Sequence, residues 1–194
     1  MACDDTLTSL WRRDESLRRA GARLAEPPAG IRVVSFDFFD TLVSRLCADP
    51  ADLFIEAGRQ LARRGLLRQP LTPSEFRAAR IAADERARRK AARGGRSNEV
   101  RLDDIYRELG NVVTDPRAAR AVEFELERAC CYLNPAVASL VRHARALGCK
   151  TVIVSDTYFT AAELVQLLGD QGLPASLFDH IFVSCECGKA KWNS

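Results

Sequence analysis

The chain has 194 residues, of which 47% are hydrophobic and 28% are charged, so it can bury a substantial core and fits one domain with an insertion. Its formal charge of +3 is too small to indicate a polyanionic partner such as nucleic acid. The longest apolar runs have the length of a strand and fall far short of the roughly 20 residues that span a bilayer, which excludes a transmembrane helix.

The cysteines and the first residues indicate a reducing compartment. Seven cysteines are an odd number for a disulfide framework, and none lies in a zinc-type pair of CxxC motifs. The acidic residues near the start, Asp4, Asp5, Asp14 and Glu15, are not typical of signal or transit peptides. We therefore expect a cytoplasmic protein with reduced thiols.

The first predicted element is an accessory helix within residues 1–29. Its apolar side chains approximate a helical stripe, and they are Leu7, Leu10, Trp11, Leu17 and Leu24. Pro27, Pro28 and Gly30 end this pattern. We expect the helix to pack on the main domain.

An apolar run follows and stops abruptly at a carboxylate. The sequence Val-Val-Ser-Phe at 33–36 precedes Asp37, and a second acid and a threonine follow at Asp40 and Thr41. This pattern predicts a buried strand with Asp37 at its C-terminal tip. Because ligands of open parallel α/β sheets bind just outside the carboxyl ends of the strands, Asp37 is a candidate nucleophile.

Residues 49–133 are predicted to form an all-helical insert, because they contain no convincing segment with a two-residue period. The predicted helices lie near 53–61, from Thr72 and Pro73 to Gly94, near 102–109, and from Pro116 onward. A block of this kind, placed just after a strand that ends in an acid, is interpreted as a cap over an active site.

The second helix of this insert carries a basic run. Between residues 77 and 96, eight basic side chains, Arg80 among them, stand against Asp84 and Glu85. We interpret the run as a solvated helix face, and the alternative is recognition of an anionic substrate or nucleic acid.

Strands and helices alternate after the insert. A helix over 137–144 precedes the apolar strand 151–155, which ends in Ser155, and a helix over 161–168 precedes the short strand 181–184. This order predicts an α/β fold with a doubly wound parallel, Rossmann-like sheet and an inserted all-helical cap. The core is assigned to residues 30–48 and 134–194.

Three segments in this frame resemble the motifs of a known family. They are Asp37-Phe38-Phe39-Asp40-Thr41-Leu42, then Val152-Ile153-Val154-Ser155-Asp156, and then the segment from Ser184 to Lys191. In this order they resemble the first three motifs of the haloacid dehalogenase-like (HAD) superfamily of hydrolases and phosphotransferases. The resemblance covers roughly residues 30–194. The wording of the first and third motifs is most similar to a bacterial branch of predicted hydrolases, often attached to domains such as glycosyltransferases.

The resemblance implies a Mg²⁺-dependent phosphatase or phosphotransferase that acts on a small phosphorylated substrate through an aspartyl-phosphate. The implied catalytic residues are Asp37 and Asp40, the phosphate-binding residues are Thr41, Ser155, Asp156 and Lys191, and the metal ligands are the Asp37 carboxylate and the Phe39 carbonyl. Ser155 would donate a hydrogen bond to a phosphoryl oxygen, helped by backbone N–H groups of the helix that follows. Lys189 is the alternative to Lys191, because the last segment can be aligned either way.

Two departures from the family pattern leave alternatives open. Phe39 stands where family phosphatases carry a second Asp, the general acid and base, and an aromatic ring cannot transfer a proton. Dehalogenases of the superfamily tolerate an aromatic residue there, so a carbon–halogen substrate is one alternative. The acidic pair of the fourth motif should lie beyond residue 194, so we expect a C-terminally truncated piece of a longer protein. A second alternative is therefore a catalytically reduced binding or accessory domain.

The individual residues also have structural interpretations. Asp37 and Asp40 could stabilise a turn, Ser155 could cap a helix, and Lys191 could be a solvated charge. Substrate identity and oligomeric state are not predicted.

Overall fold

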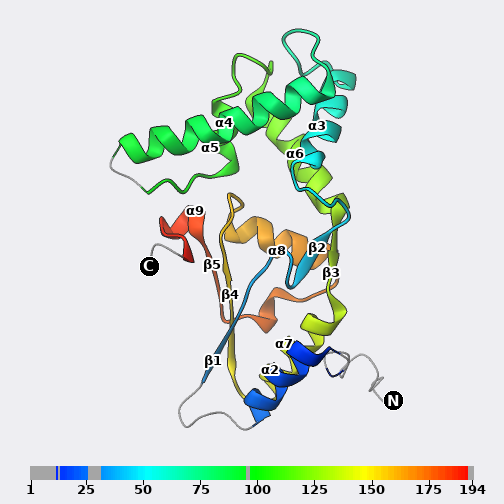
Figure 1. Cartoon of the computed structure of the whole chain (residues 1–194), viewed down its shortest axis with the longest axis vertical. Helices are drawn as coiled ribbons and strands as arrows, with labels where there is room; N and C mark the ends of the chain where they lie inside the picture. Colours follow the sequence, from blue (N-terminus) through cyan, green and yellow to red (C-terminus); the bar gives the residue numbers. More distant parts are fainter. Residues whose placement is uncertain (1–11, 13, 26–31, 95–96, 192–194) are drawn as a thin grey trace. The chain divides into compact units, whose positions relative to one another are not determined.

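The computed structural model describes residues 12, 14–25, 32–94 and 97–191 (Figure 1). The chain forms two compact units. The sheet unit contains the chain up to Ser44, Tyr132–Ser155 and Ala161–Phe182, and the helical unit contains Arg45–Cys131, Asp156–Thr160 and the residues from Val183 onward. Each unit is described separately below.

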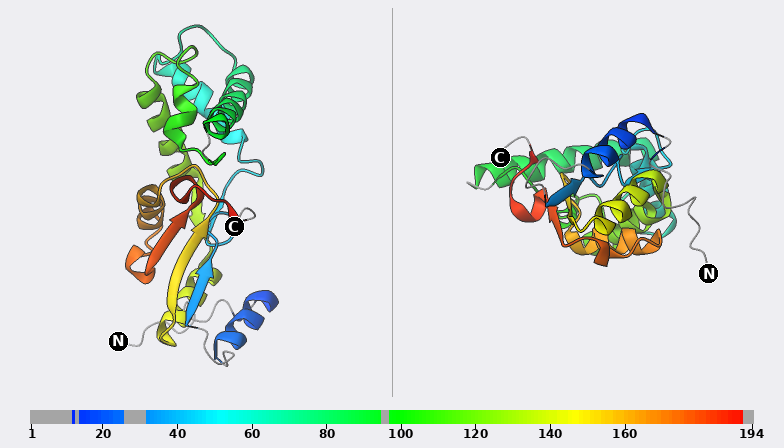
Figure 2. Two further views of the ribbon diagram at one scale, coloured as in Figure 1. Left: turned by 90° about the vertical axis from the view of Figure 1, so that its left-hand side faces the viewer. Right: turned by 90° about the horizontal axis from the view of Figure 1, so that it is seen from below.

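The sheet unit is built on three strands, β1 (Val33–Phe36), β4 (Lys150–Ser155) and β5 (His180–Val183), in the order β1-β4-β5. β1 and β4 are parallel, with Val33 beside Lys150 and Phe36 beside Ile153. The three arrows point in the same direction in the left view of Figure 2. The predicted α/β fold with a parallel, Rossmann-like sheet is confirmed.

Helices α2 (Glu15–Ala25), α7 (Pro135–Ala146) and α8 (Ala161–Asp170) complete this unit with the short 3₁₀-helix η2 (Ala175–Leu177). α7 begins where the Asn134 side chain accepts the N–H groups of Ala136 and Val137, and Pro135 occupies the first turn. α7 packs against both β4 and α2 (Figure 1). α2 therefore belongs to the accessory helix expected from the sequence, whereas Leu7, Leu10 and Trp11 lie outside the described residues.

The helical unit contains α3 (Asp52–Arg63), α4 (Pro73–Arg93), α5 (Leu102–Arg107) and α6 (Pro116–Cys130), at the positions predicted from the sequence. α3 packs against α4 and α6, and α5 packs against the same two helices. The N-terminus of α4 is a capping box, in which Thr72 accepts the Glu75 N–H and Glu75 accepts the Thr72 N–H. The short helix α9 (Ser184–Cys187) also belongs to this unit.

The contact between α3 and α4 requires a small residue. Gly58 of α3 lies so close to Phe76 of α4 that a Cβ at position 58 would be 2.9 Å from the Phe76 Cβ. Phe76 is fully buried, and so are Ala57 and Leu61 of α3. The two helices can therefore approach closely only because residue 58 has no side chain.

β2 (Val43–Arg45) and β3 (Cys131–Leu133) pair as a two-stranded sheet. The chain passes from the sheet unit to the helical unit within β2, and it returns to the sheet unit within β3. Among the helices of the described residues, none is both long and apolar enough to cross a membrane.

Candidate functional site

Asp37 directly follows β1 and is half-buried. Its Oδ1 atom accepts the Phe38 N–H at 2.8 Å, which restrains the carboxylate. The Phe38 carbonyl then accepts the N–H groups of Leu42 and Val43 at 2.9 and 2.8 Å, so residues 38–43 form a tight turn. The fully buried side chains of Phe38 and Leu42 anchor this turn in the core. Asp37 is thus held at the carboxyl end of a parallel strand, where ligands of α/β sheets bind.

Asp40 lies within this turn in the left-handed region, at φ +58°, and is the one described non-glycine residue with a positive φ. Its N–H donates to the Val43 carbonyl at 2.8 Å, and its side chain is exposed. Aspartate tolerates this conformation better than most residues do. The geometry supports the turn-stabilising interpretation of Asp40, and its catalytic role stays a prediction.

A cavity of about 530 Å³ adjoins Asp37 and Thr41 in the sheet unit. One wall consists of residues 34–36 of β1 and of Asp37, and α2 and α7 form the others, with Arg19 and Arg23 contributed by α2. The accessory helix therefore contributes Arg23, and Arg19 paired with Glu15 at 3.0 Å, to the lining of the cavity that Asp37 also lines, which the sequence pattern did not indicate.

Ser155 ends β4 and is only 2% exposed. Because Phe36 and Ile153 are partners in a parallel register, Asp37 and Ser155 follow at the same edge of the sheet. The sheet unit thus brings Asp37, Thr41 and Ser155 to one end of neighbouring strands.

The segment 156–160 belongs to the helical unit, together with Lys191. The Lys191 backbone N–H donates to both oxygens of Asp156, at 3.0 and 3.2 Å, while the Lys191 side chain is exposed. The contact between Asp156 and Lys191 is therefore made by the Asp156 carboxylate and the Lys191 backbone N–H. Lys189 is also exposed.

The helix that follows Ser155 is α8, which begins at Ala161 as the sequence predicted. Residues 156–160, between Ser155 and this helix, belong to the helical unit. The Leu102 N–H donates to the Tyr158 carbonyl at 2.9 Å, and the Thr157 N–H donates to the Ser184 hydroxyl at 3.0 Å. Backbone N–H groups of the α8 N-terminus are therefore not adjacent to Ser155 in the chain.

Arg80 corrects the interpretation of the basic run. It is fully buried, at 0% exposure, rather than part of a solvated face. Its Nε and Nη2 atoms donate to the two oxygens of Glu123 at 2.8 and 2.7 Å, and Glu123 is also 0% exposed. The prediction was wrong for Arg80 because its partner lies 43 positions away in the sequence.

Aromatic rings enclose this ion pair. The guanidinium carbon of Arg80 lies 4.4 Å from the Phe54 ring centroid and 5.2 Å from that of Tyr158, and the Tyr106 hydroxyl donates to Glu123 at 2.7 Å. Burial by itself would lower the pKa of Arg80, but the Glu123 carboxylate raises it above its usual value. Burial, and then Glu123, raises the pKa of Tyr106. Arg80 therefore stays charged while its guanidinium lies against the Tyr158 ring.

The remaining described members of the basic run are largely neutralised at the surface. Arg77 pairs with Asp49 at 2.9 Å, Arg88 with Asp84 at 2.7 Å, and Lys90 with Glu108 at 3.0 Å. This pairing favours a solvated face over an anion-binding surface.

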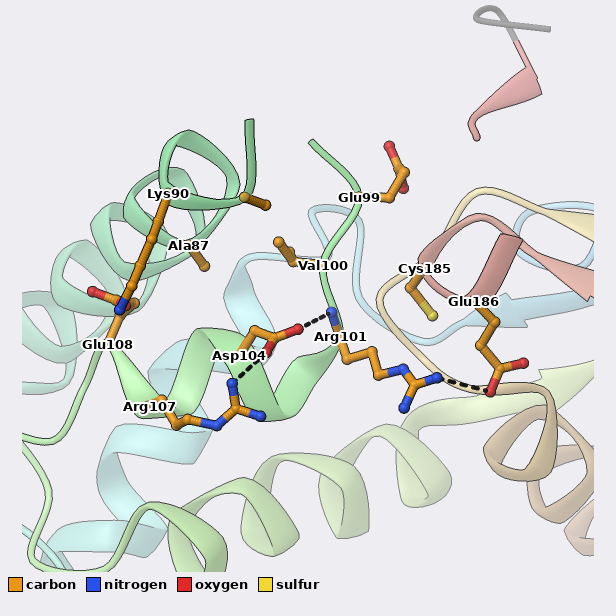
Figure 3. Close-up of a pocket in the computed structure, with 11 residues that line it drawn as sticks. Ala87, Lys90, Glu99, Val100, Arg101, Asp104, Arg107, Glu108, Cys185 and Glu186 are labelled. Carbon is orange, nitrogen blue, oxygen red and sulfur yellow. Dashed lines mark hydrogen bonds and ion pairs between the residues drawn. The ribbon is translucent and has the colours of Figure 1, made fainter. Parts of the chain in front are cut away.

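A second cavity of about 530 Å³ lies in the helical unit, between residues of α4, the segment 99–108 and α9 (Figure 3). Its charged side chains compensate one another, because Lys90 pairs with Glu108 and Arg101 with Glu186. Burial, and then Glu186, raises the pKa of Cys185 to about 12, so this thiol is a poor nucleophile at neutral pH. No predicted site residue lines this cavity.

Within the described residues, no group of three or more His, Cys, Asp or Glu side chains could hold a metal ion. The candidate donors for Mg²⁺ at the tip of β1 are the Asp37 carboxylate and the Phe39 carbonyl, which are oxygens of the kind that Mg²⁺ prefers. They fit Mg²⁺ in kind, and water and substrate oxygens would have to complete the shell.

A family model described as haloacid dehalogenase-like hydrolase matches residues 31–193. No curated protein matches the chain significantly.

Proposed function

The chain belongs to the haloacid dehalogenase-like hydrolases, and on that premise we propose that it hydrolyses the phosphate ester of a small molecule with Asp37 as the nucleophile. The observation that carries this proposal is the location of Asp37, half-buried at the carboxyl end of β1 beside a cavity. Ser155 at the end of the neighbouring strand supports it, because a buried hydroxyl can donate to a phosphoryl oxygen.

The proposed reaction has two steps. A carboxylate oxygen of Asp37 attacks phosphorus, the bond from phosphorus to the ester oxygen breaks, and the leaving alcohol takes up a proton. Water then attacks phosphorus, the bond to Asp37 breaks, and inorganic phosphate is released. Division of one difficult transfer into two easier steps is the usual benefit of covalent catalysis.

The other chain residues have supporting roles in this proposal. The Phe38 N–H bond to Asp37 orients the carboxylate, and Ser155 and Thr41 bind phosphoryl oxygens. Asp40 supplies the proton to the leaving alcohol, a role that Phe39 cannot fill. Lys191, or Lys189 in the other alignment, neutralises phosphate charge, while Asp156 fixes the Lys191 backbone.

Mg²⁺ is proposed as the cofactor, held by the Asp37 carboxylate and the Phe39 carbonyl. When bound there, it would reduce the repulsion between Asp37 and the phosphate.

A second candidate function is a binding or accessory domain with reduced catalysis. Phe39 favours it, since the usual proton-transfer group is missing, and so does the small set of carboxylates near Asp37 in the described residues. This candidate binds phosphate esters without turning them over.

The test compares the full-length protein with Asp37→Asn on a panel of phosphate esters that includes p-nitrophenyl phosphate, with and without Mg²⁺. We expect the substitution to lower kcat by on the order of 10⁴-fold or more, as loss of a nucleophile does. Circular dichroism checks that the variant folds, and Asp52→Asn, at the exposed start of α3, is the matched control. Activity retained by Asp37→Asn would reject covalent catalysis. Binding without turnover in the wild type would favour the accessory domain, and turnover of a haloacid without Mg²⁺ would favour a dehalogenase.

A further inference from the structure

Two thiols of the helical unit face each other at the paired segments β2 and β3. Cys47 lies two residues after β2, and Cys130 is the last residue of α6, directly before β3. Their Sγ atoms are 3.8 Å apart, and both residues are half-buried. The Leu46 N–H donates to the Cys130 carbonyl at 3.0 Å, so the backbones are held side by side at this point.

Other described cysteines have different surroundings. Cys131 is buried and its Sγ lies 3.6 Å from a Glu127 oxygen, while the Cys185 Sγ lies 3.2 Å from the Phe159 carbonyl. Among the thiols in the described part of the chain, the contact between Cys47 and Cys130 is the one that joins two sulfur atoms. A disulfide S–S bond is about 2.05 Å long. Side-chain rotation and a small approach of the two backbone segments would therefore bring the sulfur atoms to this distance.

We propose that Cys47 and Cys130 form a reversible intramolecular disulfide, and that the pair is a redox modification site. In the first step one thiolate attacks a low-molecular-weight disulfide such as oxidised glutathione, forms a mixed disulfide and releases one glutathione thiolate. In the second step the other thiolate attacks the protein sulfur of the mixed disulfide and releases the second glutathione. The protein loses two electrons and two protons, and the glutathione disulfide gains them.

The surroundings predict the pH dependence of this reaction. Burial, and then the neighbouring Cys130, raises the pKa of the Cys47 thiol. Since the thiolate is the attacking species, oxidation should be faster at pH 8.5 than at pH 7. The same trend applies to reduction by an added thiol.

The position of the pair decides what the bond would do. The two cysteines are 83 positions apart, so the bond would close a loop that contains nearly the whole helical block. Closure of a long loop restricts the unfolded chain. We therefore expect the oxidised protein to unfold at a higher urea concentration than the reduced protein does.

Mass spectrometry of the full chain under native conditions tests the proposal. The protein is treated with oxidised glutathione, the free thiols are blocked with iodoacetamide, and the chain is cut with trypsin without reduction. We expect the peptide 46–59 to be linked to the peptide 129–142, and dithiothreitol should separate them. Cys130→Ser should abolish the link, whereas Cys131→Ser, the matched control, should retain it.

Three results would overturn the proposal. In the first, both peptides are recovered as separate alkylated species. In the second, glutathione remains attached to Cys47 or Cys130 as a stable adduct. In the third, the link appears only after urea is added, which would mean that the native thiols cannot reach each other. All three are measured on the wild-type chain and so do not depend on whether a variant folds.

Discussion

The buried ion pair between Arg80 and Glu123 makes the helical unit sensitive to one substitution. Arg80→Met removes the guanidinium and leaves the Glu123 carboxylate, 0% exposed, with the Tyr106 hydroxyl at 2.7 Å as its remaining partner in the network described above. Breaking a buried pair on one side costs about 3–5 kcal/mol. We therefore expect the free energy of unfolding at pH 7 to fall by about this amount.

Urea unfolding followed by circular dichroism at pH 7 measures this loss. The matched control is Arg64→Met, because Arg64 pairs with Glu125 at 2.9 Å on the surface and such pairs contribute at most about 1 kcal/mol. The double substitution Arg80→Met with Glu123→Leu should recover most of the loss, since no buried charge remains. A loss below about 1 kcal/mol for Arg80→Met at pH 7 would refute this reasoning.

Two further predictions concern packing and acid stability. Gly58→Ala should lower the free energy of unfolding by about 1–3 kcal/mol, since its Cβ would meet the Phe76 Cβ at 2.9 Å. Gly169→Ala in α8 is the control, because nothing lies within 4 Å of its Cβ, and equal melting temperatures for both variants would contradict the prediction. The Thr151 N–H lowers the pKa of Asp179, so this carboxylate stabilises the fold above its unfolded-state pKa of about 3.9, and the contribution is lost as the pH falls. The difference in melting temperature between wild type and Asp179→Asn should therefore shrink from pH 6 to pH 3, and a constant difference would count against this assignment.

The sequence by itself determined the features that depend on near neighbours. Thr72 and Pro73 predicted where α4 begins, because a capping side chain and a proline act within one helical turn. The apolar run before Asp37 correctly predicted a strand that ends there, but the prediction that this strand is buried was wrong, because Val33 is 53% exposed and Phe36 is the one buried residue of β1. The order of strands and helices then restricted the fold to a parallel α/β sheet.

Only the tertiary structure decided which distant residues meet. The burial of Arg80 depends on Glu123, and the contact between Cys47 and Cys130 depends on the pairing of β2 with β3. The location of the segment 156–160 likewise depends on Leu102 and Ser184, which form hydrogen bonds with Tyr158 and Thr157. These interactions join residues tens of positions apart, and their free energies depend on packing between elements. Local periodicity carries no information on such packing. From the sequence alone, an arginine inside a basic run is therefore predicted to be exposed, and only the structure shows that Arg80 is buried with Glu123.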